Sequence, residues 1–249
     1  MTQRNIMLTL MYDGTDYHGF QRQKNGITIQ QCLEEAIKKI TGEDCSVTGC
    51  GRTDAGVHAI NYTANFKTNC RIPSDKMHFA LNAHLNDDIR VLSAEDTDDT
   101  FHARYSAIKK TYSYKILNRS VGDVFLSRYS WFYPGRLDVG LMKKATEYFV
   151  GKHDFAAFMA AGSPVKSTVR NVSELTLCEK DGVIDIEITA DGFLYNMVRI
   201  IVGTLIYVGC GKISADDISK IIHSLDRTNA GITAPPQGLS LKKVYYVEG

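Results

Sequence analysis

The chain has 249 residues, of which 44% are hydrophobic and 23% are charged, and its formal net charge at pH 7 is +1. These values are ordinary for a globular protein of one large domain or two smaller ones, and they do not by themselves indicate a nucleic-acid binder. The six cysteines form no C-x-x-C pair, which argues against a zinc site and a disulfide scaffold. The longest apolar stretch, 197–210, contains Arg199 and is shorter than the roughly 20 residues that span a bilayer.

The first half of the chain predicts the element order β-α-β-β-α-β. Thr28 and Gln31 form a capping box at the start of an apolar-striped helix that Gly42 ends. The alternation that follows predicts a strand with one buried face, made of Ile60, Tyr62, Ala64 and Phe66, and one polar face, made of Asn61, Thr63, Asn65 and Lys67. The predicted strands are 6–12, 45–48, 60–66 and 89–93, and the helices are 28–41 and 75–85.

The second half predicts the same order with one additional helix. Asp181-Gly182 between two alternating runs is a strong hairpin signal. The predicted strands are 111–117, 172–178, 183–190 and 241–247, and the helices are 139–150, 194–208 and one that begins at Ser214. The segment 155–168, with Gly162, Ser163 and Pro164 at its centre, reads as a long mobile loop.

This repeated order predicts an α+β fold of two ferredoxin-like (β-α-β-β-α-β) halves with a cleft between their sheets. We expect the N-terminal half to comprise residues 1–100 and the C-terminal half 101–249, with the boundary within 94–110. Sheets of this kind also build RNA-recognition modules, although a fold alone does not determine function.

The run Gly51-Arg52-Thr53-Asp54-Ala55-Gly56-Val57-His58-Ala59 is the most informative segment. It presents a guanidinium, a carboxylate and an imidazole on a short loop at the mouth of a predicted strand, where reactive groups are commonly placed. An aspartate between two glycines is more often a turn former. A phosphate-binding loop is disfavoured, because Asp54 occupies the third glycine position of G-x-G-x-x-G and would repel phosphate.

Basic and aromatic residues gather in a few other segments. Residues 12–23 mix Tyr17, His18, Phe20 and Arg22, which suit RNA, although an ordinary polar turn is the commoner meaning. Residues 100–122 hold five Lys/Arg and no acid, and residues 155–173 hold Lys166 and Arg170 and no acid. Such local basic stretches can form a positive face, although solvated charges without a partner are the commoner reading.

Two further segments have alternative meanings. Lys109-Lys110-Thr111-Tyr112 leads a strand in which Tyr112 is either a core aromatic or a stacking platform. Arg199 is the only charge in a long apolar run, so it is either a snorkelling structural arginine or one half of an ion pair.

The run from Gly51 to Ala59 closely resembles the signature of the tRNA pseudouridine synthase A family. The resemblance continues through 12–23, Phe101-His102-Ala103-Arg104, the segment around Tyr112, 192–199 and the 233–241 motif before the last strand. The sequence departs from the family pattern at Phe20, where tryptophan is common, and at Asn61-Tyr62, where Gly-Gln is frequent. Resemblance implies isomerisation of uridine to pseudouridine in the anticodon stem-loop of tRNA, at nucleotides 38–40, by a homodimer. Because residues 1–5 do not read as a signal peptide and the apolar run 197–210 is too short to span a bilayer, we expect a cytoplasmic protein.

The same resemblance implies roles for named residues. Asp54 is the implied catalytic carboxylate, Arg199 pairs with it and lowers its pKa, and Tyr112 stacks on the target base. We expect Arg52 to hold the flipped-out conformation of the nucleotide. The remaining expected substrate contacts are His58, Arg22, Lys109, Lys110 and Arg170.

The reaction breaks the N1–C1′ bond of uridine, turns the uracil and joins C5 to C1′, so it needs no redox cofactor, ATP or metal. Asp54 could attack C1′, remove the 2′ proton or add to C6, and the sequence does not choose between these routes. Two other functions compete with this one. An RNA-binding protein without turnover would not need the carboxylate, and a glycosidic hydrolase would usually need a second acid that the signature lacks.

Overall fold

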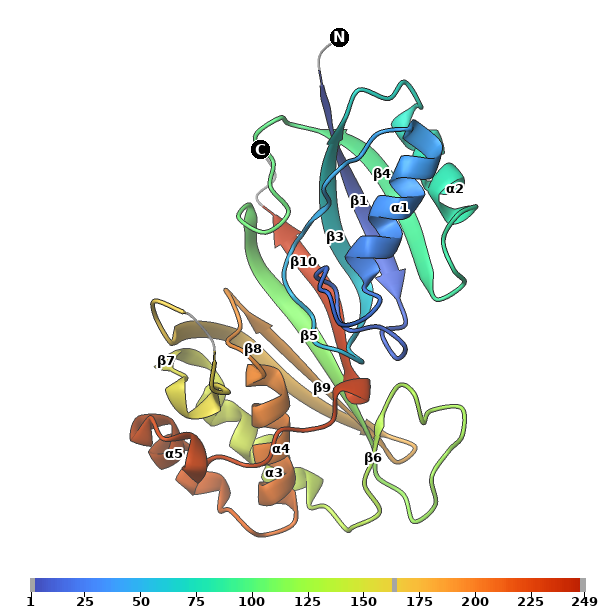
Figure 1. Cartoon of the computed structure of the whole chain (residues 1–249). Coiled ribbons are helices and arrows are strands. Elements are labelled where there is room, and N and C mark those ends of the chain that lie inside the picture. Colours follow the sequence, from blue (N-terminus) through green and yellow to red (C-terminus); the bar gives the residue numbers. More distant parts are fainter. Residues whose placement is uncertain (1–2, 163–164, 247–249) are drawn as a thin grey trace. The chain divides into compact units, whose positions relative to one another are not determined.

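The computed structural model describes residues 3–162 and 165–246 as a mixed α/β protein. The described residues form two compact units (Figure 1). The first comprises the residues up to Ile108 together with those from Ser240 onward, and the second comprises Lys109–Leu239. The final strand, which the sequence analysis assigned to the C-terminal half, therefore belongs almost entirely to the first unit.

The first unit is a sheet with the strand order β4-β1-β3-β10 and two helices. Strands β1 and β3, and β1 and β4, pair antiparallel, whereas β10 runs parallel to β3, with Ser240 opposite His58. The short β2 pairs antiparallel with β3 through Thr48 and Asn65. The bounds are β1 (Arg4–Tyr12), α1 (Ile29–Thr41), β2 (Thr48–Gly49), β3 (His58–Thr68), α2 (Ser74–Asn82), β4 (Ile89–Thr97) and β10 (Leu239–Tyr246).

Helix α1 forms where its capping residues predict it. The Thr28 hydroxyl accepts a hydrogen bond from the Gln31 backbone N–H at 3.3 Å, and Gly42 adopts the left-handed conformation with φ of 75°. Leu33 and Ile37 on its apolar face are fully buried. Figure 1 shows α1 and α2 together on one face of the sheet, so these helices cover the apolar side chains that β1 and β3 direct to that face.

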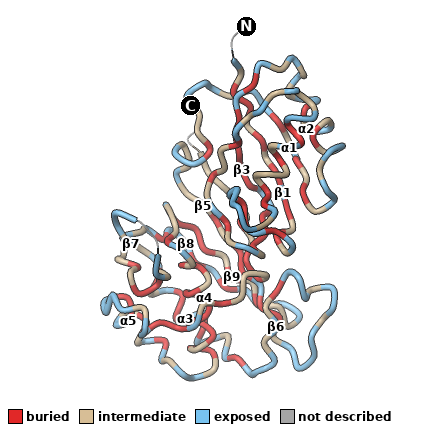
Figure 2. The backbone as a smooth tube through the Cα atoms, viewed as in Figure 1, coloured by how far each residue is buried: buried red, intermediate tan, exposed pale blue. Residues whose placement is uncertain are grey.

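The opposite face of β3 is buried at its centre, which corrects part of the prediction of a polar, exposed face, because Asn61 and Lys67 are exposed and Thr63 and Asn65 are not. Ile60, which was expected on the buried face, is 41% exposed. Thr63 and Asn65 are only 7% and 6% exposed. The Asn65 amide donates to the Asn5 side chain at 2.9 Å, and its carbonyl oxygen accepts from the backbone N–H of Ala103 at 2.9 Å. The Tyr246 hydroxyl then donates to the Ala103 carbonyl oxygen at 2.8 Å. Segments distant in sequence thus cover this face, and Figure 2 shows β3 buried along most of its length.

The second unit has the antiparallel strand order β5-β9-β8-β7, with β6 parallel to β5. Helices α3 and α4 pack on one another, and α3 contacts β8. The bounds are β5 (Ala107–Leu117), β6 (Trp131–Phe132), α3 (Val139–Thr146), β7 (Gly151–Asp154), β8 (Val169–Lys180), β9 (Val183–Ala190), α4 (Met197–Gly209) and α5 (Ile218–Ser224). Short 3-10 turns cover Glu147–Phe149, Ala156–Phe158, Ala215–Asp217, Arg227–Asn229 and Pro236–Gly238.

The hairpin prediction is confirmed, and the loop prediction is wrong at its start. Asp181 and Gly182 both have positive φ, 51° and 70°, as a two-residue hairpin with the favoured twist requires. Phe155 and Phe158 are fully buried, because they pack edge-to-face as part of the core. Ser163, at the centre of the predicted loop, lies outside the described residues together with Pro164.

The first unit reproduces the predicted β-α-β-β-α-β order. The second unit contains β-α-β-β-α with β6, β7 and α5 added, and the strand expected to complete the order is β10, which belongs to the first unit. The ferredoxin-like description and the cleft between sheets stay predictions. Within the described ranges, none of the helices is long and apolar enough to cross a membrane.

Candidate functional site

The loop between β2 and β3 ends in a tight turn that presents Asp54. The Val57 backbone N–H donates to the Asp54 carbonyl oxygen at 3.1 Å, and Gly56 has a positive φ of 76°. Arg52 is exposed, Thr53 is buried and Asp54 is half-buried. The guanidinium and the carboxylate therefore lie away from the core, and the buried Thr53 between them anchors the loop.

The segment that follows β1 clamps this loop through its backbone. The Phe20 N–H donates to the Thr53 carbonyl oxygen at 3.2 Å, and the Gly56 N–H donates to the Tyr17 carbonyl oxygen at 3.3 Å. Gly19 has φ of 81°, and a Cβ placed on it would lie 2.3 Å from the Thr53 carbonyl oxygen. Only glycine satisfies both conditions, so the chain can bring the two loops into backbone contact.

His58 secures the same two loops from within. Its ring is 4% exposed, and Nδ1 lies 3.0 Å from the Gly14 backbone N and 3.1 Å from the Asp13 carboxylate. The neutral ring accepts from the Gly14 N–H, whereas a ring protonated on Nδ1 pairs with Asp13. Either arrangement fixes the start of β3 against the 13–14 backbone, which favours a positioning role for His58.

Tyr62 lies beneath the start of the loop. Its ring is fully buried and stacks on Phe20 with centroids 4.3 Å apart and planes inclined by 20°. Its hydroxyl donates to the Gly51 carbonyl oxygen. A Cβ on Gly49 would lie 2.2 Å from that hydroxyl, so glycine is required for β2 to pass this close. Phe20 and Tyr62, two of the residues that depart from the family pattern, therefore contact one another and support the peptide before Arg52.

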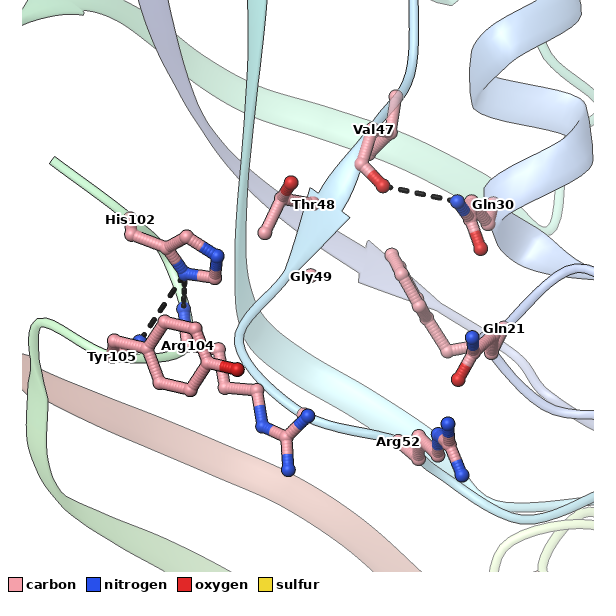
Figure 3. Close-up of a pocket in the computed structure, with 11 residues that line it drawn as sticks. Gln21, Gln30, Val47, Thr48, Gly49, Arg52, His102, Arg104 and Tyr105 are labelled. Atoms are coloured by element: carbon pink, nitrogen blue, oxygen red, sulfur yellow. Dashed lines mark hydrogen bonds between the residues drawn. The ribbon is translucent and has the colours of Figure 1, made fainter. Parts of the chain in front are cut away.

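A pocket of about 230 Å³ opens beside this loop. In Figure 3, His102, Arg104 and Tyr105 stand on one side of the pocket, and Gln21 and Gln30 stand on the other, with β2 between them. Arg52 also lines it. Sequence patterns do not single out these three residues of the 102–105 turn as site residues, although Phe101–Arg104 matches the family pattern.

Several aromatic and basic residues of the 12–23 segment are not available to RNA as predicted. Tyr17 and Phe20 are 4% and 3% exposed, because they pack under the signature loop. The Tyr17 hydroxyl donates to Asp88 at 2.6 Å, and burial together with this bond raises the pKa of Tyr17. The Arg22 guanidinium is half-exposed and forms an ion pair with Glu34 at 2.7 Å.

In the second unit, Tyr112 lies on β5 opposite Ile188 of β9. Its ring meets Phe193 edge-to-face at 5.0 Å, and the residue is only half-buried. Two residues on, Tyr114 is fully buried, and its hydroxyl donates to the Pro235 carbonyl oxygen at 2.7 Å. Burial raises the pKa of Tyr114, and the nearby positive charge of Arg199 opposes this rise.

Arg199 extends from the first turn of α4 to the connector that precedes β10. Its Nε donates to the Ala234 carbonyl oxygen at 2.6 Å, and Nη1 donates to the Asn196 side-chain oxygen at 2.8 Å. The Arg199 carbonyl oxygen in turn accepts from the Ala234 N–H at 3.0 Å. These hydrogen bonds between Arg199 and Ala234, one in each direction, explain how the only charge in the apolar run 197–210 is accommodated.

The other predicted substrate contacts are spread over the second unit. Lys109 and Lys110 are half-buried on β5. The Arg170 guanidinium donates to the carbonyl oxygens of Ser167 and Val169 at 3.0 and 2.7 Å, and it lies against Gly192, the residue before Phe193. The structure thus gathers Arg52, Asp54 and His58 in the first unit, and Tyr112, Arg199 and Arg170 belong to the second. Among the residues that the structure describes, no cluster of three His, Cys, Asp or Glu side chains could hold a metal ion.

Comparison with known proteins identifies the family. A family model described as tRNA pseudouridine synthase matches residues 9–106 and 145–247. These ranges include the signature loop, the pocket residues up to Tyr105, and Arg199. The chain belongs to the tRNA pseudouridine synthase family, which is a family of isomerases.

Curated relatives align with this chain over almost its whole length. The tRNA pseudouridine synthase A of Thermoanaerobacter sp. (strain X514) is 55% identical over 98% of this chain and 100% of its own. The proteins of the same name from Caldicellulosiruptor bescii and Ruminiclostridium cellulolyticum are 51% and 50% identical, each over 98% of this chain and 100% of its own. A solved structure titled as a Cbf5-Nop10-Gar1 complex matches over 96% of this chain and 50% of its own, at 12% identity and with a TM-score of 0.39.

Proposed function

We propose that this protein converts uridine to pseudouridine at nucleotides 38–40, in the anticodon stem-loop of tRNA, with Asp54 as the catalytic carboxylate. The observation that carries the proposal is the turn at Asp54, which offers a half-buried carboxylate on a loop held through its backbone at Thr53 and Gly56. A catalytic group needs this kind of fixed position, and a simple surface turn does not. Family membership supplies the reaction and the tRNA substrate.

Asp54 can act on the target nucleotide by three routes. As the N1–C1′ bond of uridine breaks, positive charge grows at C1′, and an ionised carboxylate can attack it, as glycosidase nucleophiles do. Removal of the 2′ proton and addition to C6 of the base use the same carboxylate. Each route ends with a C5–C1′ bond and returns Asp54 unchanged, so the atoms balance without a cofactor.

The other residues hold the extruded nucleotide. Base extrusion costs a few kcal/mol, and Arg52, exposed at the rim of the signature loop, reaches into the space that the base leaves. The half-buried Tyr112 ring supports the uracil, and its edge-to-face contact with Phe193 fixes its orientation. Arg199 orients Asp54, a role that rests on the resemblance, and its own bonds to Ala234 and Asn196 keep its guanidinium in place.

Backbone phosphates of the tRNA are contacted by Lys109, Lys110 and Arg170. Arg22 joins them only if its ion pair with Glu34 opens, and the buried His58 acts by holding the loop. We further propose that the protein works as a homodimer with tRNA as its partner, as the resemblance implies, and that it works in the cytoplasm.

The test is tritium release from C5-labelled tRNA, followed by mapping of pseudouridine. Wild-type protein releases tritium, and product appears in the anticodon stem-loop, whereas Asp54→Ala releases none. Tight tRNA binding by wild-type protein without any release would overturn the proposed activity. Release by wild type with product elsewhere in the tRNA would overturn the proposed site of modification.

A further inference from the structure

The pocket beside the signature loop is lined by positive and aromatic groups. Arg52 and Arg104 both line it, and no carboxylate is found among the described residues that do so. Within the described part of the chain, neither guanidinium forms an ion pair or donates a hydrogen bond. Two uncompensated guanidinium groups at one concave site favour an anionic ligand.

The 102–105 turn also displays an exposed ring. Tyr105 is 76% exposed, its ring lies 4.3 Å from that of His102, and the Arg104 guanidinium is 5.6 Å from the Tyr105 ring centroid. A single exposed aromatic is common on protein surfaces and indicates nothing alone. Here the ring shares a pocket wall with an imidazole and a guanidinium, which are the groups on which nucleobases stack.

This turn is rigid, which distinguishes it from an ordinary surface loop. The backbone N–H groups of Arg104 and Tyr105 donate to His102 Nδ1 at 3.2 and 3.3 Å, and the Ser106 N–H donates to the His102 carbonyl oxygen at 2.9 Å. Ala103 is fully buried and bound to Asn65 of β3. The backbone that carries the exposed ring is therefore held in place before any ligand arrives, which lowers the entropy cost of binding.

The size of the pocket limits the ligand. A volume of about 230 Å³ is below the roughly 300–1,000 Å³ of pockets for drug-sized molecules, so the pocket has room for part of a single nucleotide and none for a helix. Asp54 does not line it, yet Arg52 does, and their two Cα atoms are at most about 7 Å apart because only Thr53 stands between them in the chain. The pocket thus adjoins the proposed catalytic carboxylate without containing it.

We infer that this pocket binds an unpaired nucleotide of the tRNA that neighbours the target uridine. Its base stacks on Tyr105 and His102, and its phosphate is held by Arg104, with Arg52 adding positive charge at the rim. The inference rests on the proposed function for the identity of the RNA. It makes Tyr105 and Arg104 determinants of substrate binding rather than catalytic residues.

The experiment compares Tyr105→Ala and Tyr105→Phe with the matched control Phe79→Ala, which removes another exposed ring of the first unit. Direct tRNA binding and steady-state tritium release are measured on the full chain. Because stacking on one aromatic side chain is worth roughly 5- to 160-fold in affinity, Tyr105→Ala raises Kd and KM by that factor and leaves kcat unchanged. Tyr105→Phe restores binding, and Phe79→Ala matches wild type.

Arg104→Ala tests the phosphate contact independently of the ring. The slope of log affinity against log salt falls by about 0.7 for one lost contact to single-stranded RNA, whereas Arg104→Lys retains the slope. Arg136→Ala, which changes an exposed arginine outside the pocket, leaves this slope unchanged.

Equal Kd values for wild type and Tyr105→Ala, or a loss confined to kcat, would overturn the inference. If wild type shows no turnover while Tyr105→Ala still weakens tRNA binding, the proposed function fails and the pocket assignment stands.

Discussion

In each unit a buried tyrosine donates its hydroxyl to a connecting segment of the chain: the loop between β2 and β3 in the first unit, and the connector before β10 in the second. The two units differ in where the proposed site residue lies. Tyr62 donates its hydroxyl to the Gly51 carbonyl oxygen, and Tyr114 donates to that of Pro235. Both rings are fully buried. In the first unit the connector itself carries the proposed catalytic group, Asp54. In the second the proposed group, Arg199, lies on a helix.

The difference has a consequence for mutagenesis. Asp54 sits on a loop whose position depends on backbone contacts at Thr53 and Gly56, so replacing its side chain leaves the fold intact. Arg199 holds its own connector through Ala234, so replacing it changes both structure and activity. Loss of activity alone therefore assigns a catalytic role in the first unit but not in the second.

The largest expected effect comes from Asp54→Asn. This change keeps the shape of the side chain and removes the charge that the chemistry needs, so kcat falls by about 10⁴-fold. The midpoint of thermal unfolding and the Kd for tRNA stay at wild-type values. Asp87→Asn, at a fully exposed carboxylate of the same unit, serves as the control. Near wild-type tritium release from Asp54→Asn would remove this residue from the chemistry.

Arg199→Lys is expected to have the next largest effect. Lysine keeps the charge but cannot donate to Ala234 and Asn196 with a planar fork. A site displaced by about 1 Å loses about 10²-fold in rate, and the weakened hydrogen bonds cost about 1–3 kcal/mol of unfolding free energy. Urea denaturation measured beside kcat checks both. Unchanged stability with a full loss of kcat would mean that Arg199 does not hold the connector.

Gly19→Ala tests the backbone contact beneath the signature loop. The new methyl group would lie 2.3 Å from the Thr53 carbonyl oxygen, and φ of 81° strains any L side chain. Gly42→Ala is a matched control, since Gly42 has φ of 75° with nothing within 4 Å of its Cβ position. The control costs about 1–2 kcal/mol from the left-handed conformation alone.

Gly19→Ala adds a backbone clash to that strain, worth about 1–3 kcal/mol more, and displaces the loop that carries Asp54. Guanidinium denaturation gives the difference between the two variants, and kcat falls only in Gly19→Ala. Equal stability and equal activity in both would show that the two loops separate without consequence.

The smallest effect comes from the paired changes Tyr62→Phe and Tyr114→Phe. Each removes a hydroxyl and leaves a carbonyl oxygen without this donor, at a cost of about 1–3 kcal/mol of unfolding free energy. Tyr62→Phe also lowers kcat, because its connector carries Asp54. Tyr114→Phe leaves kcat near wild type, because Arg199 still bonds to Ala234 in the same connector. Identical kcat losses in both would contradict the contrast between the units.

Local sequence patterns predicted most of the elements correctly. The capping box at Thr28, the stop at Gly42 and the Asp181-Gly182 hairpin are all present, because each depends on residues within a few positions of one another. The signature loop was also recognised from sequence, because glycines, a carboxylate and a following strand stand next to each other in the chain. Its catalytic role stays a prediction.

Contacts between distant segments could not be read in this way. Thr63 and Asn65 looked solvent-exposed by alternation, yet Asn5, Ala103 and Tyr246 bury that face. Two core phenylalanines at 155 and 158 were assigned to a loop, because a short 3-10 turn has no clear periodicity. The burial of Tyr17 and Phe20 is also not predictable from local sequence, because it depends on loops that pack together only in the folded chain.

The sequence by itself determined the order of the helices and strands, the family and the loop that presents Asp54. Tertiary structure decided which polar strand face is covered, which rings support the loop, and that the 102–105 turn joins Arg52 in one pocket. Local propensity acts over a few residues, so a sequence records it directly. Burial and pocket formation depend on residues some 50 positions apart, as Arg52 and Tyr105 are, and only folding brings these together.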